Sequence, residues 1–202
     1  MKKRIIALGL LWCLSAVMLQ AARVDTVLVR SAAMNKDVKV VYVLPDKAIG
    51  KQACPVVYLL HGYGGNARSW VQLKPELPQM ADEKGIIFVC PDGKNSWYWD
   101  SPENPAYRYE TFVTSELVKY TDGNYATIPD RKARAISGLS MGGHGALWSA
   151  IRHKDVFGAA GSMSGGVDIR PVPPELGNEQ AVGRVCCQQG ILGCAYGGQP
   201  AG

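Results

Sequence analysis

Histidine is scarce in this sequence, which has only three among its 202 residues. No spacing of cysteine and histidine resembles a zinc site, and we predict no metal and no other cofactor. Charged residues make up 19% of the chain and hydrophobic residues 47%, a balance that excludes wholesale disorder. The length suits one domain with a substantial core.

A basic patch is also lacking. The formal net charge is +5, but Lys2, Lys3 and Arg4 contribute three of the positive charges. Without residues 1–21, the chain has 19 basic and 17 acidic residues, a net of +2. Nothing in that balance favours a nucleic-acid partner.

The one long apolar run lies at the N-terminus. A basic start at residues 2–4 is followed by an almost wholly apolar stretch at 5–19 and by the small residues Ala21 and Ala22. This layout is typical of a secretory signal peptide, and the run is short for a membrane span. We predict that residues 1–21 are a signal peptide and that the mature protein is secreted or periplasmic, with no stable membrane association. The alternative is an uncleaved anchor or a buried first helix.

Export would make disulfides possible, but five cysteines would remain in the mature chain, an odd number. Cys54 and Cys90 border predicted core strands, so we predict that both are small, buried apolar residues. The other three crowd together near the C-terminus, at Cys186, Cys187 and Cys194.

Strands and helices alternate over residues 22–170. The predicted strands are Val24–Val29, Val38–Leu44, Pro55–Leu60, Ile86–Cys90, Ala133–Ser137 and Phe157–Met163, the first two forming a hairpin. The predicted helices are Ser69–Glu83, interrupted by Pro75 and Pro78, then Tyr109–Tyr120 and Met141–Arg152. Repeated strand–helix units predict an α/β domain, with a mostly parallel sheet covered by helices on both faces.

The last thirty residues have a different character. The segment 171–202 is rich in glycine and glutamine, and no periodic run predicts another strand or long helix. One interpretation is a loose native tail. The other is a tail foreign to this domain, produced by a frameshift or a truncation, and the sheet that stops unfinished favours it. We therefore expect a fold that is incomplete at its C-terminal end.

A G-x-S-x-G motif lies at Gly138–Gly142, between a predicted strand and a predicted helix. This is the context of a nucleophile elbow, in which a sharp turn exposes the hydroxyl of Ser140 at a helix N-terminus. Small neighbours such as Gly143 leave room for the turn. We predict that Ser140 is a nucleophile, whereas the alternative is a structural or phosphate-binding turn.

A second motif, His61-Gly62-Tyr63-Gly64-Gly65, directly follows a predicted buried strand. In α/β-hydrolases, the loop after this strand supplies one oxyanion-hole N–H and the residue after the nucleophile supplies the other. The predicted donors are the backbone amides of Tyr63 and Met141. We interpret His61 as a residue that holds the loop by hydrogen bonding, with a catalytic base as the alternative.

These motifs resemble one family. Leu-Leu-His-Gly-Tyr-Gly-Gly at 59–65, Pro-Asp-Gly at 91–93, Gly-Leu-Ser-Met-Gly-Gly-His-Gly-Ala at 138–146 and the segment 157–165 are similar to the putative esterase family. That family includes esterase D (S-formylglutathione hydrolase), feruloyl and acetylxylan esterases, tributyrin esterase and the antigen 85 mycolyltransferases. The resemblance implies an α/β-hydrolase fold, Ser140 as nucleophile, and Tyr63 and Met141 as oxyanion donors.

The sequence departs from the family pattern after the nucleophile. The family's acid and base lie on loops after two further strands, whereas only His144 and His153 follow Ser140 here. His144 should point along the helix flank, and His153 lies near the far end of that helix. Three acidic residues come too early or fall in the irregular tail: Asp168, Glu175 and Glu179. We therefore predict neither the base nor the acid.

An aromatic cluster, Ser96-Trp97-Tyr98-Trp99-Asp100, lies in a loop after a strand. Trp97 and Trp99 are candidates for one wall of a substrate cleft, where they would stack on sugar or aryl groups. The alternative is a packed surface loop.

Together, the predicted export and the motifs favour a serine carboxylesterase acting on small acyl or aryl esters, including those on carbohydrates, through an acyl-enzyme. An acyltransferase of the same family is the close variant. A catalytically dead carbohydrate-binding or scaffold protein on the hydrolase fold is the alternative from another class.

Overall fold

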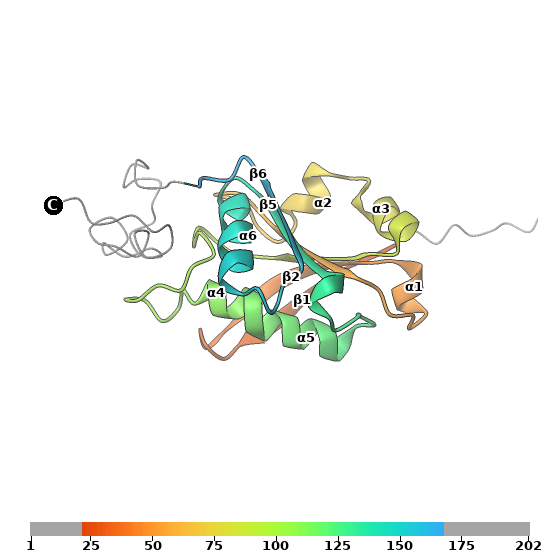
Figure 1. The fold of residues 1–202 in the computed structure, drawn as a ribbon, viewed down its shortest axis with the longest axis horizontal. Coiled ribbons are helices and arrows are strands. Elements are labelled where there is room, and N and C mark those ends of the chain that lie inside the picture. The colour runs from red at the N-terminus through yellow and green to blue at the C-terminus, as the bar shows by residue number, and fades with distance from the viewer. Residues whose placement is uncertain (1–21, 168–202) are drawn as a thin grey trace, which may run out of the picture.

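The chain folds around a six-stranded mixed sheet, seen here in a computed structural model that describes residues 22–167 (Figure 1). The strand order is β1-β2-β4-β3-β5-β6. The strands are β1 (Arg23–Ser31), β2 (Lys36–Leu44), β3 (Val56–Leu60), β4 (Ile87–Pro91), β5 (Arg134–Leu139) and β6 (Ala159–Met163). The predicted signal peptide at 1–21 and the predicted tail at 171–202 lie outside the described residues.

Strand direction divides the sheet into two parts. β1 and β2 form the predicted antiparallel hairpin, with Val29 opposite Val38, and β2 also pairs antiparallel with β4. The strands β4, β3, β5 and β6 run parallel to one another. The predicted α/β fold with a mostly parallel sheet is confirmed.

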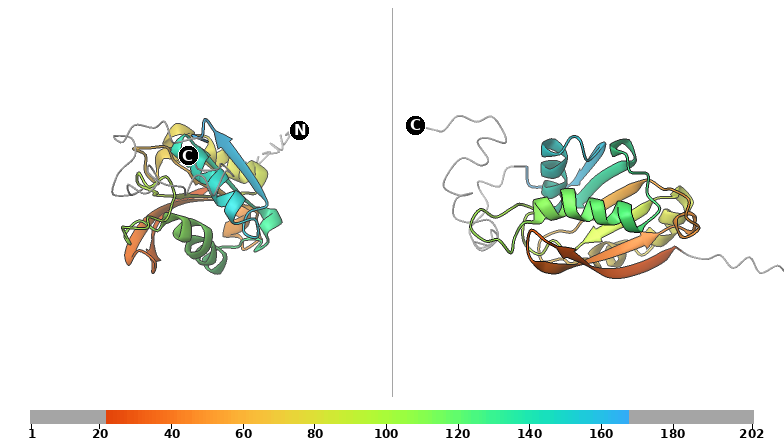
Figure 2. Two further views of the ribbon diagram at one scale, coloured as in Figure 1. Left: turned by 60° about the vertical axis from the view of Figure 1, so that its left-hand side comes forward. Right: turned by 90° about the horizontal axis from the view of Figure 1, so that it is seen from below.

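Both faces of the central strands are buried because successive side chains alternate between them. On β4, Ile87 and Val89 belong to one buried cluster, whereas Phe88 and Cys90 belong to the other. The first cluster includes residues of the helices α5 (Leu117–Asn124) and α6 (Met141–Arg152), and the second includes residues of α2 (Ser69–Leu73) and α3 (Leu77–Lys84). The sheet therefore lies between two helical layers (Figure 1, Figure 2).

The helix predicted over 69–83 is two helices, α2 (Ser69–Leu73) and α3 (Leu77–Lys84). Pro75 lies between them, as expected for a residue that breaks a helix. Pro78 does not interrupt a helix, because it occupies the first turn of α3, where a missing N–H costs nothing. Gly85 ends α3 with a left-handed φ of 63°.

The helical segment predicted over 109–120 is present and reaches Asn124. It consists of α4 (Tyr109–Thr111), a π-helical turn η1 (Phe112–Glu116) and α5 (Leu117–Asn124). A short 3-10 turn, η2 (Arg131–Ala133), leads into β5. The short helix α1 (Asp46–Ile49) was not predicted, since four residues are too few to show a helical period.

The start of the last predicted strand also differs. β6 begins at Ala159 rather than Phe157, because the amide of Phe157 still bonds the carbonyl of His153 in the turn that ends α6. Phe157 is nevertheless buried in the core. Cys54 and Cys90 are free thiols and buried, as predicted. No helix within residues 22–167 is long and apolar enough to cross a membrane.

Candidate active site

A sharp turn joins β5 to the helix α6 (Met141–Arg152), whose bounds are those predicted from the sequence. Ser140 occupies the turn with φ 54° and ψ −118°. A positive φ on a residue other than glycine costs about 1–3 kcal/mol and persists only when the surroundings hold it in place. The turn therefore places backbone strain on the residue that the sequence predicts to be a nucleophile.

Two glycines make this turn sterically possible. A Cβ atom added to Gly138 would lie 2.2 Å from the carbonyl oxygen of Gly142. A Cβ atom added to Gly142 would lie 2.2 Å from the carbonyl oxygen of Leu60, at the end of β3. The first turn of α6 thus packs against two strand ends through main-chain atoms, and any larger residue at 138 or 142 would push the helix away.

The hydroxyl of Ser140 is exposed and is not used to cap the helix. Ser140 is the N-cap residue of α6, a position where serine commonly bonds a backbone amide, yet its side chain makes no capping bond. Its main chain is held on both sides: the Ser140 N–H donates to the carbonyl of Met163 at 2.8 Å, and the Ser140 carbonyl accepts from the N–H of His144 at 3.0 Å. The helix N-terminus favours negative charge at this hydroxyl.

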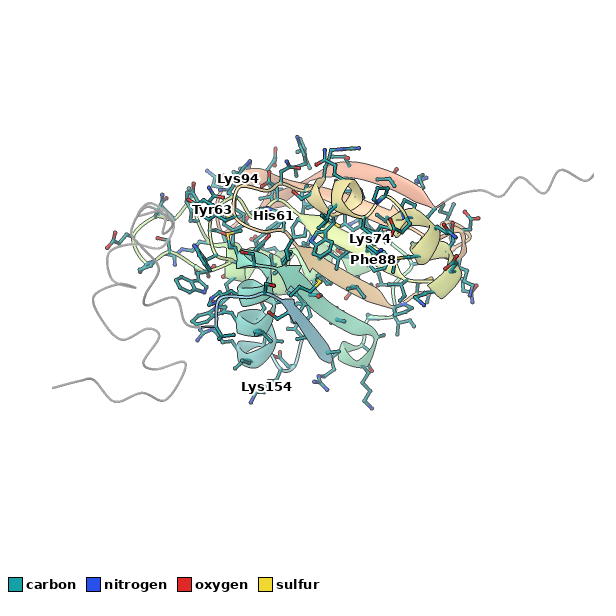
Figure 3. All side chains as sticks on the ribbon, turned by 90° about the horizontal axis from the view of Figure 1, so that it is seen from above. His61, Tyr63, Lys74, Phe88, Lys94 and Lys154 are labelled. Carbon is teal, nitrogen blue, oxygen red and sulfur yellow. The ribbon has the colours of Figure 1, made fainter. Side chains whose placement is uncertain are left out.

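The loop after β3 lies directly against this serine. A Cβ atom added to Gly62 would lie 3.6 Å from the Cβ of Ser140 and 3.4 Å from the carbonyl oxygen of Leu139. The ring of Tyr63 is 39% exposed, whereas the Met141 side chain is fully buried. Figure 3 shows Tyr63 and Lys94 near His61, at one end of the sheet. Gly62 thus brings the loop that carries Tyr63 against Ser140, and Met141 follows the serine directly in the chain.

Two hydrogen bonds to the Gly62 carbonyl orient the peptide between Gly62 and Tyr63. The Gly93 amide donates to Nε2 of His61 at 2.9 Å, so Nδ1 carries the ring proton and donates to the Gly62 carbonyl at 2.7 Å. The Gly65 amide donates to the same carbonyl at 3.0 Å. In a trans peptide the N–H points opposite to the C=O, so these two bonds set the direction of the Tyr63 N–H.

Asp92 lies behind His61, with Oδ1 3.7 Å from Nε2 of the imidazole, which is too long for a hydrogen bond. Burial alone would raise the pKa of Asp92. The ammonium and the amide of Lys94, at 2.9 and 3.0 Å from the carboxylate, outweigh burial and hold that pKa well below its usual range. Asp92 is therefore an ionised anchor of the loop after β4.

His144 lies along the flank of α6, as predicted, where its ring packs among three indoles. Its Nδ1 donates to the Gly166 carbonyl at 2.6 Å, and its ring centroid lies 5.5, 5.1 and 6.1 Å from those of Trp97, Trp99 and Trp148. Burial lowers the pKa of His144, and the bond to Gly166 only partly opposes that shift. The imidazole is thus neutral near pH 7.

Trp97 and Trp99, the predicted cleft residues, are only 8% and 4% exposed. Their rings pack against His144 and belong to the larger buried cluster, as the packed-loop alternative expects. Their contact with a substrate stays a prediction.

His153 lies at the opposite end of α6 from Ser140, about 18 Å away along a helix of 12 residues. Its Nε2 makes a hydrogen bond with a carboxylate. That carboxylate is Glu110, which also accepts bonds from Trp148 Nε1 at 2.8 Å and Arg152 Nε at 2.7 Å. Burial would raise the pKa of Glu110, but these three donors outweigh it and lower that pKa. No role was predicted for Glu110 from the sequence. Its position in register with the apolar Val113 and Leu117 was the signal that it faces the core.

Residues 22–167 contain no cluster of three or more His, Cys, Asp and Glu side chains that could hold a metal ion. What the arrangement offers is an exposed hydroxyl, strained main chain and backbone amides at a helix N-terminus.

A mostly parallel sheet with a strand–serine–helix elbow at its centre defines an α/β-hydrolase. The chain belongs to the family described as putative esterase, whose model matches residues 31–186.

Three comparisons illustrate the relationship. The acetyl esterase of Caldicellulosiruptor saccharolyticus is 27% identical over 150 residues, which cover 70% of this chain and 56% of that protein. The diacylglycerol acyltransferase/mycolyltransferase Ag85A of Mycobacterium gordonae is 34% identical over 155 residues, covering 72% of this chain and 43% of that protein. A solved ferulic acid esterase superposes with a TM-score of 0.65 at 32% identity, covering 74% of this chain and 63% of its own.

The chain thus spans about half the length of these two curated relatives. The residues that the family model matches include the elbow and the loop after β3.

Proposed function

We propose that this protein is a serine carboxylesterase in which Ser140 is the nucleophile. The observation that carries the proposal is the placement of one exposed serine hydroxyl on a strained turn, with the main chain of Gly62 against it. Membership of an esterase family supports ester chemistry in general.

In the proposed reaction, the Ser140 oxygen attacks the ester carbonyl and forms a tetrahedral intermediate. Loss of the alcohol leaves an acyl-enzyme, and water then releases the acid. The backbone N–H groups of Tyr63 and Met141 bind the oxyanion, each contributing about 3 kcal/mol to the transition state. As the first residue of α6, Met141 has an amide with no acceptor inside the helix.

We assign no general base. Both ring nitrogens of His61 are engaged by the loop main chain, His144 lies among tryptophans, and His153 bonds Glu110. Ser140 in this 202-residue chain is therefore expected to be a weak nucleophile at neutral pH. The part of the proposal tested most directly is the acylation site, not the rate of turnover.

For substrates, we propose esters of small acyl or aryl acids, including esters carried by carbohydrates. Relatives named acetyl esterase and ferulic acid esterase support this class. The exposed ring of Tyr63 beside Ser140 is a surface on which an aryl or sugar group could stack.

Acyl transfer to an alcohol is the second candidate, favoured by the 34% identity to a protein named as an acyltransferase. The two reactions share the acyl-enzyme and differ in the nucleophile that resolves it. Adding an alcohol acceptor and measuring the ratio of transesterified to hydrolysed product separates them.

We also propose export with cleavage after Ala21. The main-chain nitrogen of Ala22 lies 2.6 Å from Oδ2 of Asp82, so the new N-terminal ammonium would meet a carboxylate. N-terminal sequencing of the mature protein tests this, and soluble protein that retains Met1 would contradict it.

Labelling with a fluorophosphonate tests the nucleophile. We expect intact-mass and peptide analysis to find one adduct, on Ser140, in the full chain and in Ser115→Ala, a matched serine on η1. Ser140→Ala should give no adduct. An adduct on another residue, or none in the unmodified chain, would contradict the proposal.

A further inference from the structure

Tyr98 links three segments of the candidate site that are far apart in sequence. Its side chain is fully buried, and its hydroxyl donates to the carbonyl of His61 at 3.2 Å. The ring also meets the imidazole of His61 edge-on, with 5.9 Å between centroids. Tyr98 therefore contacts the loop after β3 through both its polar and its apolar atoms.

Glycines on two other elements make room for this ring. A Cβ atom added to Gly93 would lie 2.3 Å from the ring, and one added to Gly145 would lie 2.6 Å from it. Gly93 follows β4, and Gly145 lies in the second turn of α6. The ring is thus packed between the nucleophile helix and the loop that holds the predicted oxyanion donor.

The backbone around Tyr98 is strained. Trp97 and Tyr98 have φ values of 55° and 61°, a left-handed conformation that bulky side chains rarely adopt, and here it occurs at two consecutive residues. The turn is closed by Ser96, whose hydroxyl donates to the Gly93 carbonyl at 2.6 Å and accepts from the Tyr98 amide at 3.0 Å. Strain of this kind persists where the surroundings over-determine it, and it is concentrated at functional sites.

The bond to His61 has a direct effect on the neighbouring peptides. Tyr98 holds the carbonyl of the His61–Gly62 peptide, while the imidazole of His61 holds the carbonyl of the Gly62–Tyr63 peptide. Both peptide planes on either side of Gly62 are therefore fixed. Without these bonds, the conformational freedom of glycine would let both planes rotate.

We propose that Tyr98 is a positioning residue for the oxyanion site. Its hydroxyl fixes the plane of the His61–Gly62 peptide, and its ring sets the distance between this loop and α6. The Tyr63 N–H is thereby held in place before a substrate binds. This inference rests on the proposed esterase function. Tyr98 itself does not touch the substrate.

The test compares Tyr98→Phe with Tyr42→Phe in the full chain. Tyr42 is a fair control because its ring is equally buried and its hydroxyl also makes one buried bond, to Thr121 at 2.9 Å. Both variants keep the ring and lose a hydroxyl, so both should lose a similar amount of stability.

The rate of fluorophosphonate labelling at Ser140 should separate them. Since complete loss of an oxyanion donor lowers rates 100-fold or more, a loosened donor should lower the maximal labelling rate about tenfold, with unchanged saturation by the probe. Tyr42→Phe should label within about twofold of the unmodified protein. Equal rates for Tyr98→Phe and the unmodified protein would overturn the inference.

A second measurement is independent of reactivity. Hydrogen exchange and the chemical shift of the Tyr63 amide should change in Tyr98→Phe and not in Tyr42→Phe. If the unmodified chain is not labelled at Ser140, the proposed function fails, and an unaltered Tyr63 amide in Tyr98→Phe would then overturn the positional inference separately.

Discussion

The carboxylate of Glu110 accepts a hydrogen bond from the indole N–H of Trp148 at 2.8 Å, across 38 residues of sequence. Arg152 and His153 bond the same carboxylate, and Arg152 also lies over the Trp148 ring at 4.9 Å. All three donors are on α6 or at its end, whereas Glu110 lies on α4. One buried side chain therefore ties the nucleophile helix to the helical layer beside it.

Replacing Glu110 with glutamine should destabilise the protein by about 1.5–3 kcal/mol, because hydrogen bonds to a charged group are lost. Chemical denaturation monitored by tryptophan fluorescence measures the change. Glu103→Gln, at an exposed loop position, is the control and should stay within about 0.5 kcal/mol of the unmodified protein. A similar midpoint for both variants would show that the Glu110 bonds contribute no net stability.

Alanine at Gly145 should lower stability even though alanine is normally the better helix residue. The added Cβ would lie 2.6 Å from the buried Tyr98 ring, and overpacking of this kind costs about 1–3 kcal/mol. Gly123 on α5 has nothing within 4 Å of such a Cβ, so Gly123→Ala should stabilise by about 0.5–1 kcal/mol. Thermal melts of the two variants should shift in opposite directions, and a shared direction would contradict the packing described.

Alanine at Gly142 should separate α6 from β3. The added Cβ would lie 2.2 Å from the carbonyl oxygen of Leu60, a main-chain atom that cannot rotate away. We expect a loss of about 3 kcal/mol or more, at the upper end for overpacking, together with loss of fluorophosphonate labelling at Ser140. Near-normal folding and labelling would show that the elbow tolerates a side chain here.

Stability should fall as the pH drops below about 6.5, the usual pKa of histidine, because burial lowers the pKa of His144 in the folded state. Below that pH the unfolded chain binds a proton at residue 144 that the folded protein does not bind. The contribution of His144 to stability is therefore complete above the pKa of His144 in the unfolded chain, and it decreases as the pH falls below that pKa. One such group gives a slope of at most about 1.4 kcal/mol per pH unit.

Denaturant unfolding between pH 7.5 and 5 checks this prediction. The carboxylates of Asp92 and Glu110, whose pKa values are lowered, should lose their contribution only below about pH 4.5, outside that range. His144→Gln should show a shallower dependence on pH than the unmodified protein. Parallel profiles would indicate that burial of His144 does not govern this range.

Local signals were enough to predict most elements. The helix Met141–Arg152 has the bounds that its sequence predicts, and alternating burial on β4 follows from a short apolar run. The helix α1 is too short to show a helical repeat of apolar residues. Phe157 is a residue type common in strands, but its amide bonds the carbonyl of His153 in the turn that ends α6. Such ends depend on which hydrogen bonds form in space.

The candidate site also has features that the sequence predicts and contacts that it does not. The elbow is one short stretch of sequence, and the loop at 61–65 is another. The spacing of glycines within each stretch was therefore enough to predict it. The bonds from Tyr98 to His61 and from Trp148 to Glu110 join residues 37 and 38 positions apart, and no short-range pattern encodes that pairing. Trp97 and Trp99 show the ambiguity most clearly, since an aromatic loop residue can face a substrate or the core.

The contact between the start of α6 and the end of β3 is made by main-chain atoms, at Gly142 and Leu60. Tyr63, on the loop that follows β3, is exposed and takes no part in that contact, so residue 63 can change without altering it. For protein engineering, position 63 is the place to diversify in a library aimed at new acyl groups. Positions 138 and 142 should be left invariant, because every variant there would be selected first for folding and only then for specificity.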